Sequence, residues 1–411
     1  MSRIRDISLA PIGKEKMEWA WQYMKILHQI QKEVEATKPL KGMDVTVSIH
    51  IEAKTANLCR VLRSAGAHVV LTGCNPLSTQ DAVAAALVAD GFDVYAWHAA
   101  TPEEYDSHIE EALSQKPHVI IDDGGDLVAM LHGKRKDLAE RLIGGSEETT
   151  TGVMRLRIKD KNGELRFPMF AVNDARCKHL FDNRYGTGQS SWDAIMRNTN
   201  MVIAGKNVCV AGYGMCGRGV AQKAHGLGAR VFVCETDPVR ALEAAMDGYF
   251  AVPMGEAAKV CDIFVTVTGC RDIIRKEHFE VMKDGVLLAN AGHFDVEINK
   301  VDLKAMSKEI VRKRDNIEGY VLHDGRTLNL IGEGRLVNLA AGDGHPIEIM
   351  DMSFGLQVLS VLHMAEHGKE LANKVYNVPK ELDDKVARLA LSAMGAGVDE
   401  LTPEQERYIH G

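Results

Sequence analysis

The segment from Lys206 to Pro238, KNVCVAGYGMCGRGVAQKAHGLGARVFVCETDP, carries the strongest structural pattern in the chain. It opens with the apolar run 208–211, which has the length and β-branched content of a buried parallel strand. A glycine-rich turn follows, and then a helix of small and apolar residues. A second strand, 230–234, leads to the acidic residue Glu235. This order of strand, glycine turn, helix, strand and acid predicts a dinucleotide-binding βαβ unit.

Each glycine of the turn has its own task in such a unit. Gly212 permits the tight turn, Gly214 lets the backbone approach a pyrophosphate, and Gly217 lets the helix pack on the strand. The helix N-terminus directs its free N–H groups at the phosphates. Glu235 accepts hydrogen bonds from a ribose and repels a 2′-phosphate, so NAD is expected rather than NADP. The glycine spacing alone also fits an ordinary α/β turn, but the complete pattern favours the cofactor site.

Length and composition place this unit in a larger protein. The 411 residues are too many for one compact core, so two domains are expected. The net charge of −8 argues against nucleic acid or a membrane surface as a partner. No secretory signal or membrane span is visible in the sequence. Eight cysteines without C-x-x-C spacing are interpreted as reduced core residues of a cytoplasmic protein, with no metal site.

A second series of strands and helices precedes the cofactor unit. An amphipathic helix is predicted over 13–34. The runs that alternate after it are strands at 45–49, 68–72, 93–96 and 118–121, and helices at 52–65, 79–91, 102–113 and from 125 onward. This alternation predicts a second doubly wound domain, in which ligands collect at the carboxyl ends of the strands.

Polar residues follow several of these strands. His50 comes after the first, the run DDGGD at 122–126 after the fourth, and SEETTTG at 146–152 shows no core-facing pattern. Each of these alone also fits a turn or a helix cap. Farther on, Lys178 and Asp182 are spaced to share one helix face, either as an exposed ion pair or as part of a site just before the cofactor domain.

The alternation continues beyond the cofactor unit. Strands are predicted at 263–268 and 286–290, and His293 follows the second of them beside a glycine. His293 is either a core histidine or an active-site residue, and its place at a strand end favours the site. Two helices, 347–367 and 380–394, come after this domain.

Taken together, these segments resemble the S-adenosylhomocysteine hydrolase family. Its ordered motifs are DDGGD, SEETTTG, VND with K-x-x-x-D-N, GYGxxGxG, TGC, GHFDVEI, EGRLVNL and GHP, and the resemblance runs from about residue 40 to 405. The short form of the chain is similar to the archaeal and Thermotoga-type branch.

The resemblance implies an α/β protein with two doubly wound, Rossmann-like domains joined by hinges. A substrate-binding domain would comprise 1–183 and 347–390, an NAD-binding domain 184–346, and a short tail 391–411. It further implies a cytoplasmic homotetramer that holds NAD tightly and acts in the methyl cycle of one-carbon metabolism.

The family reaction oxidises the 3′-OH of the nucleoside, removes the C4′ proton, expels homocysteine, adds water and reduces the ketone again. By resemblance, Lys178 and Asp182 assist deprotonation of the 3′-OH, with the pKa of the lysine lowered by burial near the cofactor cation. Asp123 is the base at C4′, and His50 and His293 serve the 5′ side. The residues implied for substrate binding are Glu148, Thr149, Glu52, Lys54, Asp343 and His345. Those implied for cofactor binding are Thr149, Thr150, Thr151, Asn183, Gly212, Gly214, Gly217, Glu235 and Asn338.

The chain departs from the family pattern at three places. Thr187 stands where most members carry a cysteine, so a catalytic thiol is not expected there. The end of the chain lacks the longer tail whose Lys and Tyr reach the NAD of a neighbouring subunit in the family, so weaker cofactor binding is expected. At the purine pocket, Lys54 replaces the glutamate or glutamine that accepts from the adenine amino group. Either Lys54 only pairs with Glu52 or Asp343, or hypoxanthine is preferred and the substrate is S-inosyl-L-homocysteine. A simple NAD-dependent nucleoside dehydrogenase and a non-catalytic NAD-binding regulator remain as alternatives.

Overall fold

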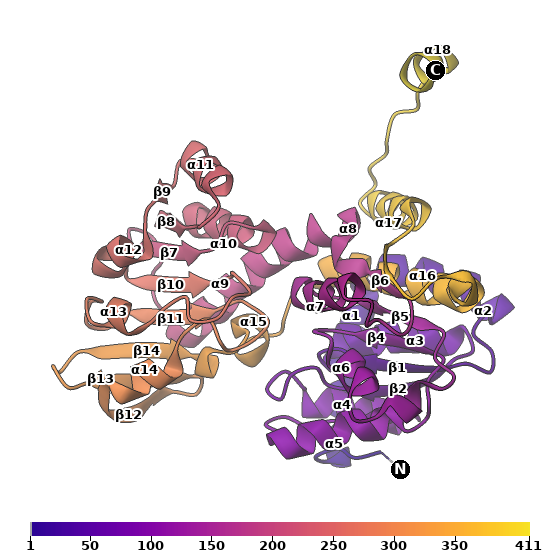
Figure 1. Cartoon of the computed structure of the whole chain (residues 1–411), viewed down its shortest axis with the longest axis horizontal. Helices are drawn as coiled ribbons and strands as arrows, with labels where there is room; N and C mark the ends of the chain where they lie inside the picture. The colour runs from indigo at the N-terminus through magenta and orange to yellow at the C-terminus, as the bar shows by residue number, and fades with distance from the viewer. Residues whose placement is uncertain (1) are drawn as a thin grey trace.

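The computed structural model describes residues 2–411 and shows two α/β lobes with a C-terminal tail that extends away from them (Figure 1). The first lobe contains the N-terminus and the second contains the glycine-rich unit. The chain crosses from the first lobe to the second and later returns, because α16 and α17 lie with the first lobe (Figure 1).

The first lobe is built on a seven-stranded sheet in the order β15-β6-β5-β4-β1-β2-β3, and every pair in it is parallel. Its strands are β1 (Asp44–Ser48), β2 (His68–Thr72), β3 (Asp93–Tyr95), β4 (Val119–Asp122), β5 (Gly144–Glu147), β6 (Met169–Ala171) and β15 (Val375–Asn377). The strand order reverses between β1 and β4. In doubly wound sheets this point opens a crevice above the carboxyl ends of the strands.

Helices connect these strands and cover the sheet (Figure 1). They are α1 (Ala10–Tyr23), α2 (Lys25–Thr37), α3 (Ala53–Ser64), α4 (Asp81–Ala89), α5 (Pro102–Leu113), α6 (Asp126–His132), α7 (Thr150–Lys161), α8 (Arg176–His179), α16 (Ile347–His367) and α17 (Lys380–Ala393). The single helix predicted over 13–34 is therefore wrong, because the chain breaks at Met24. The carboxylate of Asp351 accepts the N–H groups of Ile26 at 2.7 Å and Leu27 at 2.9 Å, so it starts a new helix.

The prediction that SEETTTG lacks a core-facing pattern is also wrong in part. Its first residues belong to β5, a fully buried strand between β4 and β6. Glu147 ends this strand inside the protein, where one carboxylate oxygen accepts the N–H groups of Gly124 and Thr149, each at 2.9 Å. The polar sequence hides the strand, because two backbone N–H groups of neighbouring loops bind the Glu147 carboxyl and burial raises its pKa well above the ordinary value.

The second lobe is built on an eight-stranded sheet in the order β12-β13-β14-β11-β10-β7-β8-β9. Its strands are β7 (Asn207–Ala211), β8 (Arg230–Cys234), β9 (Phe250–Ala251), β10 (Ile263–Thr266), β11 (Leu287–Asn290), β12 (Ser307–Arg314), β13 (Ile317–Leu322) and β14 (Thr327–Ile331). Its main helices are α9 (Thr187–Thr199), α10 (Met215–Gly226), α11 (Pro238–Met246), α12 (Met254–Val260), α13 (Lys276–Phe279), α14 (Lys300–Ala305) and α15 (Val337–Ala340). In sheet order, the six strands β9-β8-β7-β10-β11-β14 pair in parallel. The pairs β12–β13 and β13–β14 are antiparallel, and the predicted βα alternation did not include them.

The two crossings between the lobes lie against each other. The first passes through the single-turn helix η4 (Asp182–Gly186) into α9, and the second passes through 342–346 into α16. A Cβ on Gly186 would lie 2.8 Å from Nδ1 of His345, so the imidazole of the second crossing rests on the backbone of the first. Because of this contact, both crossings are held next to the crevice.

Two features of the C-terminal part complete the fold. Within the described residues, one segment, the α16 helix continued to Glu370, is long and apolar enough to cross a membrane by length and composition. Most of α16 is buried against α2, α3 and α17, as the core helix of a folded domain is. Beyond α17 the tail carries α18 (Pro403–His410), which stands apart from both lobes (Figure 1).

Candidate active site

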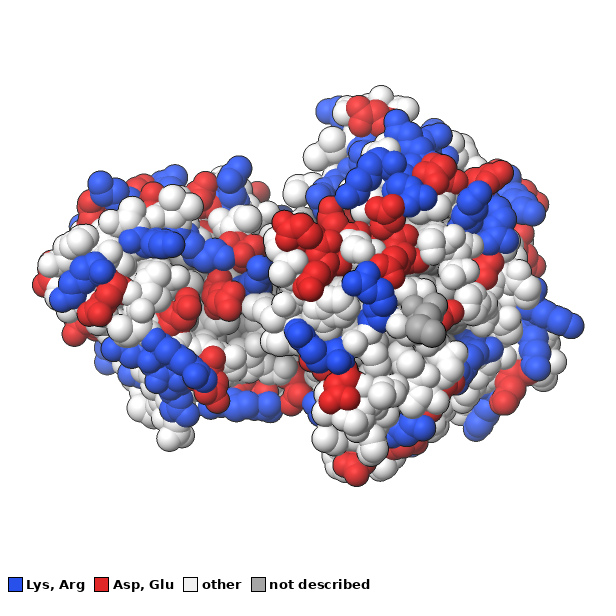
Figure 2. Space-filling model, turned by 90° about the horizontal axis from the view of Figure 1, so that it is seen from below, with Lys and Arg blue, Asp and Glu red and all other residues white. Residues whose placement is uncertain are grey.

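A cavity of about 1100 Å³ lies where the strand ends of the two lobes face each other. Residues from both lobes line it, and almost all the residues predicted from sequence for catalysis and binding are among them. In the space-filling view the molecule narrows between the lobes, and basic and acidic side chains are interspersed over the face shown (Figure 2). The cavity thus joins the glycine-rich turn to the polar residues that follow β1, β4 and β5.

The predicted pair Lys178 and Asp182 forms a buried ion pair in this cavity. Lys178 Nζ lies 3.2 Å from Asp182 Oδ1, 3.5 Å from Glu148 Oε1 and 2.9 Å from Asn183 Oδ1. Lys178 is on α8 and Asp182 begins η4, so the pair sits directly at the first crossing. The alternative of an exposed surface pair is excluded by their burial.

The expectation of a lowered pKa for Lys178 is not met by the charges of the protein. Burial acts to lower the pKa of this lysine, but the carboxylates of Asp182, Glu148 and Asp123 outweigh it and raise the pKa. The protein alone therefore keeps Lys178 protonated. The sequence-based expectation attributed a lowered pKa of Lys178 to the positive charge of the cofactor. That charge acts against the three carboxylates, which raise the pKa.

Asp182 is held by more groups than the sequence indicated. His345 Nδ1 lies 3.0 Å from Asp182 Oδ1, and Ser353 Oγ donates to Oδ2 at 2.7 Å. Burial alone would raise the pKa of Asp182, but Lys178 and His345 outweigh it and hold the pKa well below its usual value. This carboxylate remains charged. His345, predicted as a substrate-binding residue, thus also contacts the acid–base pair.

The helix α16 supports the site with residues that the sequence reasoning missed. Gln357 Nε2 donates to Glu148 Oε2 at 2.5 Å, while Gln357 Oε1 accepts from Ser146 Oγ at 2.6 Å. Burial raises the pKa of Glu148 against the opposing charge of Lys178. Ser353 and Gln357 are four residues apart, so they project from the same helix face. That i,i+4 pair of polar residues among the apolar residues of the middle of the helix was the available sequence signal.

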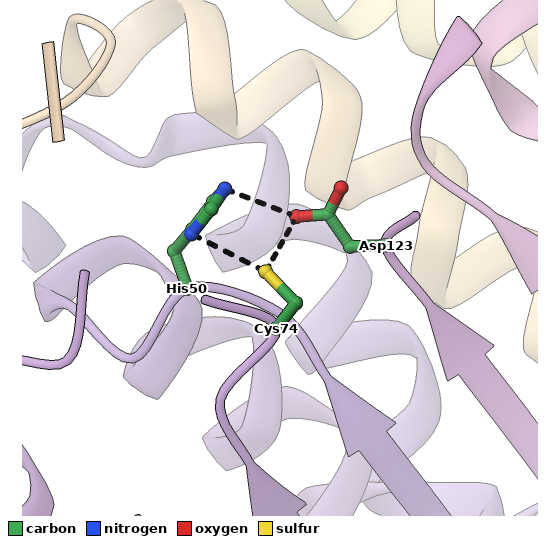
Figure 3. Close-up of side chains that lie close together, drawn as sticks. All are labelled: His50, Cys74 and Asp123. Carbon is green, nitrogen blue, oxygen red and sulfur yellow. Dashed lines mark hydrogen bonds and ion pairs between the residues drawn. The ribbon is translucent and has the colours of Figure 1, made fainter. Parts of the chain in front are cut away.

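Asp123 and His50 meet at the point where the strand order reverses. His50 Nε2 lies 3.4 Å from Asp123 Oδ2, and Cys74, which follows β2, completes a compact group with them (Figure 3). Burial and the charge of Glu148 raise the pKa of Asp123 to about 8. Burial lowers the pKa of His50 well below its ordinary value, so this imidazole is neutral. Cys74 was not singled out from the sequence.

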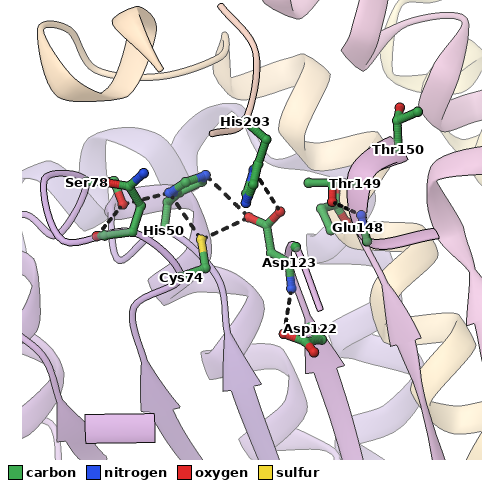
Figure 4. Close-up of polar contacts among 12 residues, drawn as sticks. His50, Cys74, Ser78, Asp122, Asp123, Glu148, Thr149, Thr150 and His293 are labelled. Atoms are coloured by element: carbon green, nitrogen blue, oxygen red, sulfur yellow. Dashed lines mark hydrogen bonds and ion pairs between the residues drawn. The ribbon is translucent and has the colours of Figure 1, made fainter. Parts of the chain in front are cut away.

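His293 reaches this group from the second lobe (Figure 4). Its Nδ1 lies 4.0 Å from Asp123 Oδ1, and a Cβ on Gly124 would come within 2.4 Å of its Nε2. Gly124 must therefore lack a side chain for the lobes to approach this closely. Burial lowers the pKa of His293 to about 4, so it is neutral as well. The histidine assigned to the site by its place after a strand does lie there.

The glycine turn has the geometry that a dinucleotide requires. A Cβ on Gly217 would lie 2.0 Å from the carbonyl oxygen of Gly212, so α10 packs directly on the turn. Gly212 has a φ of +104°, which favours glycine, and the space beside Gly214 is open. Glu235 follows β8, and its Oε2 accepts the Tyr213 N–H at 2.8 Å. The turn and the acid therefore face the same end of the sheet.

The remaining predicted cofactor residues surround the other end of the cavity. Thr149 caps α7, and Thr150 and Asn183 both hydrogen-bond to Asn173 Oδ1, at 3.1 Å and 3.0 Å. Thr151 lines the cavity beside them. Asn338 donates to Ser190, but its buried Oδ1 has no partner among the described residues. An unpaired buried amide oxygen at the cavity, together with the open glycine turn, fits NAD as the bound group.

The predicted purine pocket is formed by Lys54 and Glu52, but not by the side chain of Asp343. Lys54 Nζ lies 2.9 Å from Glu52 Oε2 and donates to the backbone carbonyl of Asp343 at 2.8 Å. The carboxylate of Asp343 turns away to Arg197 at 2.9 Å and is largely exposed. The suggested side-chain pairing of Lys54 with Asp343 is corrected to a contact with its main chain.

Comparison with known proteins places this geometry in a family. The model of the S-adenosyl-L-homocysteine hydrolase family matches residues 1–140, and that of its NAD-binding domain matches residues 183–344. An S-inosyl-L-homocysteine hydrolase of Methanococcus maripaludis is 55% identical over 100% of this chain and 98% of its own length. An adenosylhomocysteinase of Thermococcus kodakarensis is 54% identical over 99% of this chain and 96% of its own length. An adenosylhomocysteinase of Thermotoga maritima is 53% identical over 97% of this chain and 98% of its own length.

Fold and site define a two-domain α/β enzyme with an NAD-binding unit facing a buried acid–base cluster. The chain belongs to the S-adenosyl-L-homocysteine hydrolase family.

Proposed function

We propose that the protein hydrolyses an S-nucleosyl-L-homocysteine reversibly to a nucleoside and L-homocysteine. The observation that carries this proposal is the convergence of Lys178–Asp182, Asp123 and the glycine turn on one cavity. A thioether at C5′ of an unactivated sugar leaves poorly, and NAD, when bound, supplies reversible oxidation at C3′ that makes the C4′ proton acidic.

The protein residues divide the proton transfers among them. With the positive charge of the bound cofactor opposing the surrounding carboxylates, Lys178 would release its proton and accept that of the 3′-OH, while Asp182 stays charged and holds the lysine. Glu148 with Thr149 orients the ribose hydroxyls. Asp123 removes the C4′ proton, because its raised pKa suits a base that works near neutral pH. His50 and His293 lie beside Asp123 on the two lobes and serve the leaving sulfur and the incoming water. Because the lobes meet at Gly124, closure excludes bulk water from this cluster.

We further propose that hypoxanthine is accepted at least as well as adenine. An ammonium has three N–H donors and no acceptor, and two of those of Lys54 are used by Glu52 and the Asp343 carbonyl. The third N–H donor of Lys54 remains for the purine base. By the family resemblance, this position normally carries an acceptor for the adenine amino group. The O6 of hypoxanthine accepts from this donor, and its N1–H can be accepted by Glu52. An amino group facing Lys54 would leave a buried donor unpaired.

Both names among the relatives are consistent with this proposal, since some are S-inosyl and some are S-adenosyl hydrolases. The assembly is proposed to be a cytoplasmic homotetramer acting in the methyl cycle, in keeping with the family resemblance. The alternative of a plain nucleoside dehydrogenase predicts steady release of NADH.

The deciding experiment measures homocysteine release from paired S-adenosyl and S-inosyl substrates while absorbance at the NADH band is followed. Homocysteine release without net NADH supports the hydrolase. NADH accumulating in proportion to substrate consumed would establish the dehydrogenase instead. The ratio of kcat/KM for the two substrates gives the base preference in the same assay.

A further inference from the structure

Four side chains from three strand ends form one hydrogen-bonded group beside the C4′ site (Figure 4). His50 follows β1, Cys74 and Ser78 follow β2, and Asp123 follows β4. One ring nitrogen of His50, the sulfur of Cys74 and one carboxylate oxygen of Asp123 all lie within 4.8 Å of one another. Sequence reasoning assigned roles to His50 and Asp123 only, so the presence of Cys74 and Ser78 in the group requires an explanation.

Nδ1 of His50 has two neighbours, Ser78 and the Cys74 sulfur at 3.2 Å, and Ser78 is the nearer of the two. Its Oγ lies 2.6 Å from His50 Nδ1, and the same hydroxyl donates to the backbone carbonyl of Asn75 at 3.1 Å. A serine hydroxyl has one proton, so when it donates to the carbonyl its oxygen must accept from Nδ1–H. Neutral His50 then has a lone pair on Nε2, the nitrogen that lies 3.4 Å from Asp123 Oδ2.

Cys74 distinguishes the two oxygens of Asp123. Its thiol donates to Oδ2 at 3.2 Å, and His50 Nε2 faces the same oxygen (Figure 3). Burial and the Asp123 charge raise the pKa of the Cys74 thiol well above its ordinary value, so the proton needed for this bond stays on sulfur. Oδ1 is buried and has no hydrogen-bond partner among the described residues. The thiol therefore holds Oδ2, whereas Oδ1 is available to accept a proton.

We propose that Cys74 and Ser78 are positioning residues that select the reacting atoms of Asp123 and His50. Cys74 holds Oδ2 of Asp123 so that Oδ1 receives the C4′ proton. Ser78 holds His50 in the Nδ1–H form so that Nε2 is the basic nitrogen on the 5′ side. The inference deepens the proposed function and rests on it for the substrate.

The step that these atoms serve is balanced within the substrate and Asp123. The C4′–H bond of the 3′-ketone breaks, and its proton passes to Oδ1. The electron pair of that bond forms the C4′–C5′ double bond while the C5′–S bond breaks. The sulfur leaves with its electron pair as the homocysteine thiolate.

The pH dependence of this step is set by all the ionisable groups that face Asp123. These groups are His50, Cys74, Asp122, Glu147, Glu148, Lys178 and His293. A donor to a carboxylate stabilises its charged form, so removal of the Cys74 thiol raises the pKa of Asp123 further. The active, deprotonated base is then reached only at higher pH.

The first test reads the tautomer of His50 directly and does not depend on catalysis. Long-range ¹H–¹⁵N spectra are recorded on the full-length protein labelled with [¹⁵N]histidine, and His50 is assigned by the signals missing in His50→Gln. We expect the Nδ1–H pattern in the wild type, its loss in Ser78→Ala and its return in Ser78→Thr. A wild-type His50 protonated on Nε2, or a Ser78→Ala spectrum unchanged from it, would overturn the role of Ser78.

The second test follows wash-in of solvent deuterium at C4′ of the bound nucleoside as a function of pH. In Cys74→Ala the acid limb is expected to move up by roughly half to one pH unit, and Cys74→Ser, which retains a donor, should restore it. Cys59→Ala is the matched control, because Cys59 is equally buried but lies in the core of α3 away from the cavity. Equal acid limbs in the wild type and in Cys74→Ala, or an equal shift in Cys59→Ala, would refute the role of Cys74.

The two proposals fail in different ways. A wild-type protein that exchanges no deuterium at C4′ contradicts the proposed hydrolase reaction, whatever the spectrum of His50 shows. A wild type that exchanges normally, with Ser78 and Cys74 variants indistinguishable from it in tautomer and pH profile, keeps the reaction but removes the positioning role.

Discussion

The ammonium of Lys54 is bound to the backbone carbonyl of Asp343 at 2.8 Å, while the carboxylate of Asp343 points away toward Arg197. A side chain from α3 of the first lobe is thereby tied to the second crossing between the lobes. The cavity wall at Lys54 and the second crossing share this contact, so a substitution at Lys54 also removes a contact between the first lobe and that crossing.

Lys54→Gln should shift the preference from hypoxanthine toward adenine. Glutamine offers an acceptor to the amino group, and an unpaired buried donor costs about 1–3 kcal/mol, or roughly ten- to a hundredfold in kcat/KM. The measurement compares kcat/KM of both substrates on both proteins. Asp343→Asn is the control, because its side chain faces Arg197 and the base preference should not change. A wild-type preference for adenosine above tenfold that Lys54→Gln leaves unaltered would reduce Lys54 to an ion-pair partner of Glu52.

Asp123→Asn should separate the two halves of the reaction. Oxidation at C3′ depends on Lys178 and Asp182, whereas removal of the C4′ proton needs a carboxylate. The variant is expected to reduce bound NAD when nucleoside is added, yet to exchange C4′ deuterium about a hundredfold more slowly or worse. Exchange at the wild-type rate would identify another base. Lys178→Ala should instead suppress the reduction of bound NAD, and C4′ exchange should fall with it, because the C4′ proton becomes acidic only after C3′ is oxidised.

Ser353→Ala should slow C3′ oxidation without removing any group that touches the substrate. Its hydroxyl donates to Asp182 Oδ2, and loss of a bond to a buried charged group costs about 1–3 kcal/mol, so a five- to hundredfold decrease in NAD reduction is expected. Ser360→Ala is a matched control, since Ser360 is buried on the same helix and its hydroxyl has no hydrogen-bond partner in the part of the chain that the structure describes. Single-turnover absorbance measures both, and equal rates in the two variants would show that Ser353 only packs.

The rate of C4′ exchange should fall as the pH is lowered below about 8, the raised pKa of Asp123 in the free protein. Burial and the charge of Glu148 favour the protonated acid, and only the carboxylate can act as the base. In kcat/KM the loss approaches tenfold per pH unit. Glu148→Gln removes a negative neighbour and should move this acid limb to lower pH, even if the rate itself declines. A limb that stays in place would mean that another group governs it.

The purified protein should contain NAD that was never added. The glycine turn, Glu235 and the Asn338 oxygen that has no partner among the described residues together favour binding of NAD, and the reaction regenerates the oxidised cofactor. Denaturation followed by enzymatic assay of the supernatant measures the content. Gly217→Ala should lower it strongly, because its Cβ would lie 2.0 Å from the Gly212 carbonyl. Gly226→Ala, at the open end of the same helix, is the control that should retain NAD. Protein free of both NAD and NADH would contradict the prediction.

The sequence alone determined the class of both lobes, because strand-length apolar runs and glycine turns are local patterns that need no knowledge of distant residues. It also determined the cofactor unit from Gly212 to Glu235 and, through the family motifs, the polar residues at the strand ends. Its errors arose where a distant residue decides local structure. The helix break at Met24 depends on Asp351, more than 300 residues away, whose carboxylate caps the next helix.

Only the tertiary structure decided how the site residues are held and charged. Ser353 and Gln357 come from α16, yet they orient Asp182 and Glu148 from the first part of the chain. Cys74 and Ser78 gained a role only when β2 was placed beside β1. The pKa of Lys178 is raised because several carboxylates surround it and outweigh its burial. The pKa of Asp123 is raised to about 8 by its own burial and by the charge of Glu148. Hydrogen-bond partners and electrostatic fields are properties of three-dimensional proximity, and spacing along the chain does not encode them pair by pair.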